Sequence, residues 1–268
     1  MLDKPTGALE SGELAAVTEL YIVADGAVGD KDAFYAAYNE WNTHGHSSEA
    51  SVSTLSDMTL FPNLTTLCIV SGEYTDLSSL ESCRAMTHVE LYNNYKLTDI
   101  SALVSLYELN YVGAIACPNV EDVTPLVGLP KLKNLDLSGR DQAFDAAPVA
   151  RMGDFDLLLL KGVEDAHRYL GGKNICHLRL SETNIETMEP LQTVTGMDVL
   201  ELGGSAIRDL AGIQKHTLLR KVDISHTAVT DLTPLRELPD LTELILSDDM
   251  DVDISVLSDM PGLTIVYQ

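Results

Sequence analysis

The chain has 268 residues, and 41 acidic against 17 basic side chains give it a formal net charge of −24. A charge of this sign repels phosphate groups, which argues against a nucleic-acid-binding protein. Hydrophobic residues make up 45% of the sequence, enough to bury a large core, which excludes an acidic disordered chain. The sequence has no apolar run long enough for a transmembrane helix, and residues 1–12 lack the order of a signal peptide.

A phrase of the form LxxLxL recurs along the chain. Its eleven copies begin at Val17, Leu64, Met86, Leu109, Leu132, Phe155, Ile175, Met197, Leu219, Leu241 and Leu263. From Leu64 onward, successive copies are 20 to 23 residues apart. The alternation of apolar residues within each copy predicts a short strand with one buried face, and the fixed period indicates stacked repeats.

The first two copies are 47 residues apart, so this interval holds one repeat and an insertion at about residues 26–52. Residues 30–41, DKDAFYAAYNEW, predict a short amphipathic helix that begins after Asp30. A polar loop at residues 42–51 follows it. The segment either interrupts the second turn of the repeat array or caps its start, because repeat arrays need a polar cap at each end.

A second phrase lies between the strands and predicts a short helical turn in most repeats. LTDISAL (97–103) and VTDLTPL (229–235) are two examples. The residue before each turn has a side chain that can accept a hydrogen bond from a free backbone N–H at a helix start. These capping residues are Asp76, Asp99, Asp122, Asp145, Thr187, Asp209, Asp231 and Asp253.

With these two phrases the sequence resembles the 22-residue leucine-rich repeats of the bacterial internalins. DVTPLVGLPKLKNLDL (122–137) and DLTPLRELPDLTELIL (231–246) match the repeat consensus of that family at almost every position. The sequence departs from it after the strands, where the usual asparagine is kept only as Asn94. In the family these asparagines form a ladder that ties the loop backbones of neighbouring repeats together. Hydroxyls and water must therefore partly replace that ladder here. Residues 163–174 are also irregular, and we expect the solenoid to deform there.

The resemblance implies an α/β fold, a right-handed leucine-rich repeat solenoid with a parallel sheet on its concave face and short 3₁₀ or helical segments on its convex face. We expect residues 1–268 to form a single domain of about eleven repeats. Each unit is too small to bury its own apolar face, so the core forms where neighbouring repeats stack.

Residues between the buried strand positions should point away from the core and line the concave face. Apolar and aromatic residues interrupt this polar face in its middle repeats, and basic residues flank them, which is typical of a protein-binding surface. The predicted partner-binding residues are Glu90, Tyr92, Tyr111, Leu157, Leu159, Lys161, His177 and Arg179. The structural alternative is that the irregular segment 163–174 covers Leu157 and Leu159.

Other chemistry finds little support in the sequence. His44 and His46 form an HxH pattern without further ligands at suitable spacing, and the acids of residues 248–253 lack the central glycine and final glutamate of a calcium loop. No phosphate-binding loop is present. We therefore expect no catalytic residue, no metal and no cofactor. No disulfide is expected among the four cysteines, which lie in different layers and faces: Cys68, Cys83, Cys117 and Cys176.

The resemblance implies a non-enzymatic module that binds a protein, or a glycan, with its concave face, at a bacterial surface or after secretion. A second hypothesis is an intracellular leucine-rich repeat scaffold, or the regulatory subunit of another enzyme, and the lack of a signal-peptide pattern favours it. The two open sheet edges leave the oligomeric state undetermined.

Overall fold

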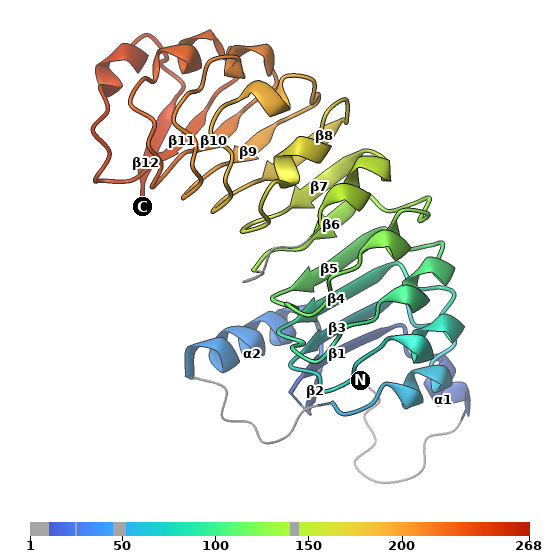
Figure 1. The fold of residues 1–268 in the computed structure, drawn as a ribbon. Helices are drawn as coiled ribbons and strands as arrows, with labels where there is room; N and C mark the ends of the chain where they lie inside the picture. The colour runs from blue at the N-terminus through green and yellow to red at the C-terminus, as the bar shows by residue number, and fades with distance from the viewer. Residues whose placement is uncertain (1–10, 25, 45–51, 140–144) are drawn as a thin grey trace. The chain divides into compact units, whose positions relative to one another are not determined.

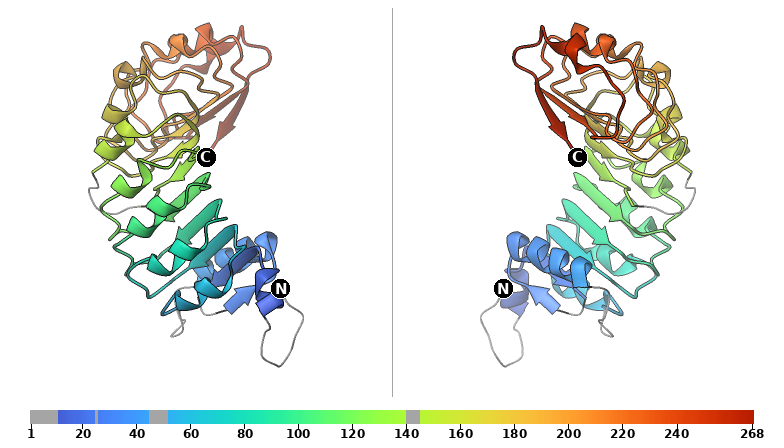
Figure 2. Two further views of the ribbon diagram at one scale, coloured as in Figure 1. Left: turned by 90° about the vertical axis from the view of Figure 1, so that its right-hand side faces the viewer. Right: turned by 90° about the vertical axis from the view of Figure 1, so that its left-hand side faces the viewer.

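The computed structural model describes residues 11–24, 26–44, 52–139 and 145–268. The chain divides into two compact units, unit 1 at Met1–Leu132 and unit 2 at Lys133–Gln268. Both units consist of short, mainly parallel strands joined through 3₁₀ helices (Figure 1). The 3₁₀ helices of each unit form a row along one side of its strands (Figure 2). We call the opposite side of the strands the strand face.

In unit 1 the described strands follow the order β2-β1-β3-β4-β5. β2 runs antiparallel to β1, and the remaining pairs are parallel. The elements in chain order are α1 (Ser11–Ala15), β1 (Glu19–Val23), β2 (Gly26–Val28), α2 (Lys31–His44), η1 (Ser56–Leu60), β3 (Thr66–Val70), η2 (Ser78–Ser82), β4 (His88–Tyr92), η3 (Ser101–Ser105), β5 (Tyr111–Ile115) and η4 (Thr124–Leu126).

In unit 2 the strands β6 to β12 lie side by side in chain order, and each pairs in parallel with the next. The elements are β6 (Asn134–Asp136), η5 (Ala147–Arg151), β7 (Phe155–Leu159), η6 (Ala166–Tyr169), β8 (Ile175–Arg179), η7 (Glu189–Leu191), β9 (Val199–Glu201), η8 (Ile213–Lys215), β10 (Lys221–Asp223), η9 (Thr233–Glu237), β11 (Glu243–Leu246), η10 (Ile254–Leu257) and β12 (Thr264–Tyr267).

The predicted strand phrases are confirmed, since each of the eleven copies contains a strand. Equivalent positions lie opposite one another: Leu135 pairs with Leu158, and Leu158 with Leu178. Because neighbouring strands lie about 4.8 Å apart, such positions stack into rows of aliphatic side chains. These three leucines are fully buried. Burial of one such side chain stabilises the fold by about 1.5–3 kcal/mol relative to its exposure to water.

The predicted capping residues bind the backbone at the turns, although only Asp253 stands at the N-cap position itself and the others precede it. Each of the eight accepts a hydrogen bond from the backbone N–H two residues farther along the chain. The oxygen–nitrogen distance is 2.7 Å at Asp99 and 3.4 Å at Thr187. Hydrogen bonds from Thr233 also hold the pKa of the Asp231 carboxyl below its ordinary value. In seven of the eight repeats the donor belongs to the first turn of the 3₁₀ helix that follows, so the side chain satisfies one of its free N–H groups; the donor of Asp209, Ala211, precedes η8.

Asn94 ties together the loops that follow β3 and β4. Its side chain is fully buried. Nδ2 donates to the carbonyl oxygens of Ile69 at 3.3 Å and Tyr92 at 3.0 Å, and Oδ1 accepts from the Gly72 N–H at 2.8 Å. One side chain therefore binds three backbone groups from two neighbouring repeats, and the Tyr92 carbonyl oxygen accepts from the Ser71 N–H at 2.9 Å as well.

Other residue types take this position in later repeats, as the sequence predicts. The Cys117 thiol donates to the carbonyl oxygen of Leu91 at 3.5 Å. The hydroxyls of Thr183 and Thr227 each donate to a carbonyl oxygen three residues back, at 2.6 Å. These two hydroxyls bond within their own loops, so at this position the thiol of Cys117, and not a hydroxyl, is seen to reach the preceding repeat.

The predicted insertion forms two elements, β2 and α2, within the residues that the structure describes. β2 pairs with β1 at the first edge of the sheet. α2 begins after Asp30 as predicted, and the Asp30 carboxylate accepts from the Ala33 N–H at 2.9 Å. The helix lies on the strand face of unit 1, opposite the 3₁₀ helices (Figure 1). The helix runs three residues farther than predicted, so residues 42–44 of the predicted loop are helical, and residues 45–51 lie outside the described residues.

The irregular segment 163–174 lies on the side of the 3₁₀ helices, because its η6 packs between η5 and η7. Lys173 anchors it: its Nζ donates to the carbonyl oxygens of Ala150 at 3.3 Å and Met152 at 2.7 Å. This position differs from the structural alternative, in which the segment would cover Leu157 and Leu159 on the opposite face. Both leucines remain partly exposed there.

Candidate interaction surface

The strand face of unit 1 is largely covered by α2. Phe34, on the inner side of the helix, is fully buried and packs against Tyr21, Cys68 and Val70 of the strands beneath it. Tyr38, one turn farther along, lies with its ring centroid 4.6 Å from that of Tyr92. A second apolar core therefore forms on the side of the sheet that the repeat pattern predicts to face solvent.

Glu90 lies at the base of this second core and is only 3% exposed. Its Oε1 accepts hydrogen bonds from the hydroxyls of Tyr92 at 2.6 Å and Tyr111 at 3.2 Å. Its Oε2 accepts from the Tyr35 hydroxyl at 3.0 Å and lies 3.3 Å from His88 Nε2. Burial alone would raise the pKa of Glu90, but these hydrogen bonds outweigh it and hold the pKa below its ordinary value.

Three of the predicted partner-binding residues thus lie in this network in unit 1. Glu90 is buried, and the Tyr92 ring packs against α2. Tyr111 stacks on His88 with 4.3 Å between ring centroids and remains half-buried. The expectation that Glu90 and Tyr92 face solvent does not hold, because the insertion folds back over the strands that carry them.

The other five predicted residues belong to unit 2, where they occupy neighbouring positions on the strand face. Leu157 on β7 lies opposite His177 on β8, and Leu159 lies opposite Arg179. Lys161 lies two residues after the end of β7. All five side chains are partly exposed. The structure therefore brings these five residues together on adjacent strands.

Glu201 on β9 contacts both His177 and Arg179 of this surface, and it is not among the predicted partner-binding residues. Its Oε1 lies 3.0 Å from His177 Nε2, and its Oε2 accepts from Arg179 Nε. Burial alone would raise the pKa of Glu201, but the interactions with His177 and Arg179 lower it to about 2. The alternation of side chains along β9 could have indicated this position, since Glu201 is in register with Arg179.

A shallow hollow continues this surface towards the end of the chain. Its lining includes Lys161, Arg179, Glu201, Asp223 and Ser225. The Ser225 hydroxyl donates to the Asp223 carboxylate at 2.7 Å, not to a histidine. The arrangement provides charge and hydrogen-bonding groups for recognition.

This fold is similar to that of solved leucine-rich repeat structures. An internalin, InlF, of Listeria monocytogenes superposes with a TM-score of 0.70 and 22% sequence identity, over 99% of this chain and 71% of that protein. The chain has the leucine-rich repeat fold of the internalins. It is an α/β solenoid of parallel strands and 3₁₀ helices. No protein-family model matches the sequence, and no curated protein matches it.

Two receptors share the leucine-rich repeat fold more distantly. A TDR receptor superposes with a TM-score of 0.56 and 12% identity, over 80% of this chain and 40% of that protein. The plant peptide hormone receptor RGFR1, solved in complex with RGF2, superposes with a TM-score of 0.51 and 12% identity, over 81% of this chain and 46% of that protein. The chain spans less than half the length of either receptor.

The remaining sequence candidates have these outcomes in the leucine-rich repeat structure. All four cysteines are free, and Cys68, Cys83 and Cys117 are buried whereas Cys176 is exposed. His46 of the HxH pattern lies outside the described residues. Asp253 accepts from the Ser255 N–H at 2.9 Å and so acts as a turn cap. Among the described residues, no helix combines the length and apolar character needed to cross a bilayer.

Acid should destabilise unit 2 through Glu201. Its pKa is about 2 in the folded protein against an ordinary value of 4.5, so the paired carboxylate stabilises the fold above pH 4.5. That contribution, roughly 3 kcal/mol for a shift of this size, is lost as the pH falls from 4.5 towards 2. Urea unfolding of the wild type and of Glu201→Gln across this interval measures it.

The difference in unfolding free energy between these two proteins should shrink as the pH falls. Glu243→Gln is the matched control, because Glu243 forms a more exposed ion pair than Glu201, with Lys221 at 2.7 Å on the same face. Its stability difference from wild type should be small at every pH. A Glu201→Gln difference that does not change with pH would show that the carboxylate has no special role in stability.

Proposed function

We propose that this leucine-rich repeat protein is a non-enzymatic interaction module that binds a protein partner on the strand face of unit 2. The observation that carries the proposal is the openness of this face, where Leu157 and Leu159 are partly exposed next to His177 and Arg179. In unit 1, α2 already occupies the corresponding face. Apolar side chains exposed together on an open sheet favour a partner that removes them from water.

The charged residues around the leucines favour a partner of mixed polarity. Lys161 pairs with Glu182 at 3.0 Å, and its side chain keeps 39% of its exposure. Arg179 pairs with Glu201, and its side chain keeps 35%. Both cations retain donors that a partner carboxylate or carbonyl can reach, while the ion pairs hold them in place before binding. The partner should place apolar side chains over the leucines and acceptors over these cations.

The internalin-like fold and the solved complex of RGFR1 with RGF2 support a role in protein recognition. The resemblance to the internalins extends the proposal to a bacterial surface or secreted location. Fractionation of the source cells with an antibody against the chain checks this location. A glycan is the alternative ligand class, and a glycan array screened with the full chain distinguishes it from a protein.

A photo-crosslinking experiment tests the surface directly. A benzophenone amino acid replaces Leu157, and the full chain is irradiated with an extract of the cells or fluids that it meets. The expected result is a crosslinked protein whose yield falls at least tenfold when Leu159→Asp is added, because the new charge must be desolvated on binding. Leu159 is only half-buried, so thermal unfolding should show little change in stability.

The matched control places the same crosslinker at Leu218, which is 57% exposed in a turn of unit 2 that lies off the strand face. The partner should not crosslink from that position. Equal crosslinking from Leu218, or a yield from position 157 that Leu159→Asp leaves unchanged, would refute the assignment of the strand face.

A further inference from the structure

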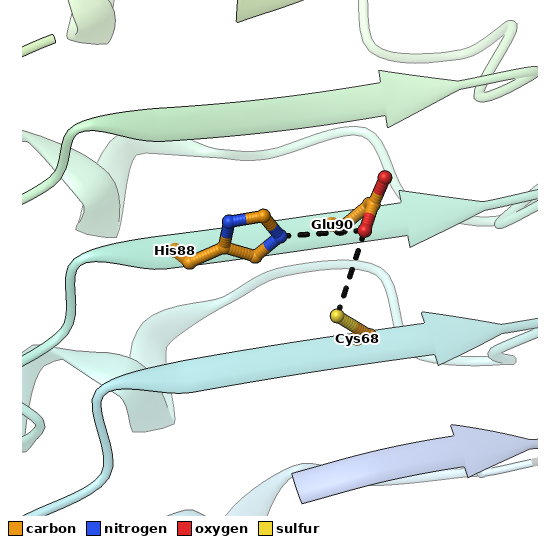
Figure 3. Close-up of side chains that lie close together, drawn as sticks. All are labelled: Cys68, His88 and Glu90. Atoms are coloured by element: carbon orange, nitrogen blue, oxygen red, sulfur yellow. Dashed lines mark hydrogen bonds and ion pairs between the residues drawn. The ribbon is translucent and has the colours of Figure 1, made fainter. Parts of the chain in front are cut away.

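Three side chains of types that bind metal ions lie close together on the strand face of unit 1. Cys68 on β3 lies directly opposite Glu90 on β4. His88 precedes Glu90 by two residues on the same strand, so both side chains point to the same face. The Cys68 thiol, the His88 imidazole and the Glu90 carboxylate meet over these two strands (Figure 3).

Two of the three separations between the donor atoms match those of a tetrahedral metal site. Glu90 Oε2 lies 3.3 Å from His88 Nε2 and 3.6 Å from Cys68 Sγ, and all three donor atoms lie within 4.8 Å of one another. Tetrahedral zinc has bonds of about 2.3 Å to sulfur and about 2.0–2.1 Å to nitrogen and oxygen, so its ligands lie about 3.3–3.6 Å apart. The Glu90 carboxylate therefore already lies at these distances from both other donors, and the thiol and imidazole lie within 4.8 Å of each other.

Surrounding residues orient the donors as outer-shell groups do in metal sites. The hydroxyls of Tyr92 and Tyr111 donate to Glu90 Oε1, while Oε2 lies towards Cys68 and His88 and also accepts from the Tyr35 hydroxyl at 3.0 Å. The His88 ring is fixed by stacking on Tyr111, 4.3 Å between centroids. The carboxylate and the imidazole therefore already have the orientation that a shared ion requires.

Charge and burial also suit a divalent ion. Cys68 is 1% exposed and Glu90 is 3% exposed, so an ion between them would be shielded from water. Binding would release the thiol proton, and the thiolate and carboxylate together would then neutralise the two positive charges of the ion. A neutral complex avoids the cost of an unpaired buried charge.

We propose that Cys68, His88 and Glu90 form a binding site for one divalent transition-metal ion, with zinc the best match to the donor set. Thiolate, imidazole and carboxylate are ligands that zinc takes together, and three protein ligands leave a fourth position for water. The ion links β3 to β4 beneath α2. The site was not predicted from the sequence, because its ligands are spaced unlike any zinc motif and meet only through strand pairing.

The experiment uses the full chain after treatment with a chelator under reducing conditions. Cobalt(II) is titrated as a spectroscopic substitute for zinc. In a separate sample loaded with zinc, elemental mass spectrometry measures the molar ratio of zinc to chain. The expected result is one ion per chain, with the d–d bands of tetrahedral cobalt and a sulfur-to-cobalt charge-transfer band that zinc abolishes. Cys68→Ser should remove the charge-transfer band, and His88→Gln should weaken binding at least tenfold.

Cys176→Ser is the matched control, because Cys176 is exposed and lies in unit 2. It should keep both the band and the stoichiometry. Tyr92→Phe, which keeps all three ligands but removes a hydrogen bond to Glu90, should weaken binding about 10–100-fold. Circular dichroism of each metal-free variant establishes that it is folded. Absence of binding by the folded wild-type chain, or a charge-transfer band that survives Cys68→Ser, would overturn the proposal.

Discussion

Phe34→Ala is expected to lower the free energy of unfolding of unit 1 by about 3–5 kcal/mol and to detach α2 from the strand face. Phe34 is fully buried, and its ring lies 5.8 Å from that of Tyr21 and 6.0 Å from that of Tyr92. Removal of the ring leaves a cavity at the centre of the contact between the helix and the sheet. A single exposed helix of this length has little stability of its own in water.

Thiol reactivity gives a direct readout of this change. Cys68 lies under Phe34, whereas Cys176 is exposed in the wild type. One thiol per chain should therefore react quickly in the native wild type, and a second should become reactive in Phe34→Ala. Urea unfolding measures the loss of stability in parallel.

Tyr107→Ala is the control for loss of an aromatic ring. Tyr107 belongs to the same unit but is 59% exposed, so its replacement should change stability by no more than about 0.5 kcal/mol. If Cys68 in Phe34→Ala stays as unreactive as Cys83 and Cys117, then this ring does not hold α2 in place.

Asn94→Ala is expected to cost about 3 kcal/mol or more, the second large effect. The side chain is fully buried, accepts from the Gly72 N–H and donates to the carbonyl oxygens of Ile69 and Tyr92. The Tyr92 oxygen keeps its bond from the Ser71 N–H in the variant, so the cost arises mainly at Gly72 and Ile69. Each buried backbone group left without a partner costs about 1–3 kcal/mol, and water entering the space would recover only part of this. Chemical denaturation measures the total.

Hydrogen exchange locates the effect within unit 1. The Gly72 amide should lose protection in Asn94→Ala, while amides of unit 2 keep theirs. Asn110→Ala is the matched control, because Asn110 is exposed although its Nδ2 donates to the Lys131 carbonyl oxygen at 3.2 Å. It should cost less than about 1 kcal/mol. Equal losses in the two variants would contradict the role assigned to the buried asparagine.

The repeat architecture could be predicted because its signals are local. The alternation of apolar residues in LTELIL (241–246) encodes one buried strand face, and Asp231 lies two residues before the N–H that it caps. Both features operate within a single repeat, so each repeat predicts its own strand and turn. The same reasoning predicted a helix that begins after Asp30, because helix caps are also local.

The candidate surface could be predicted only in part. Leu157, Leu159, Lys161, His177 and Arg179 share a face in unit 2, as the strand register predicts. Glu90 and Tyr92 follow the same register in unit 1, yet α2 covers them. The register shows which way a side chain points along its strand, but it contains no information about a helix from another part of the chain.

The sequence by itself determined the strands, the capped 3₁₀ turns and the direction of each side chain, because these depend on residues within one repeat. The tertiary structure decided which of those side chains meet solvent. In unit 1 the burial of Phe34 against Cys68 and Val70 brings α2 over the sheet, and the desolvated Glu90 then gathers its donors from α2 and neighbouring strands. Hydrophobic burial is non-directional, so the docking of an amphipathic helix depends on the apolar area available in three dimensions and cannot be derived from repeat spacing.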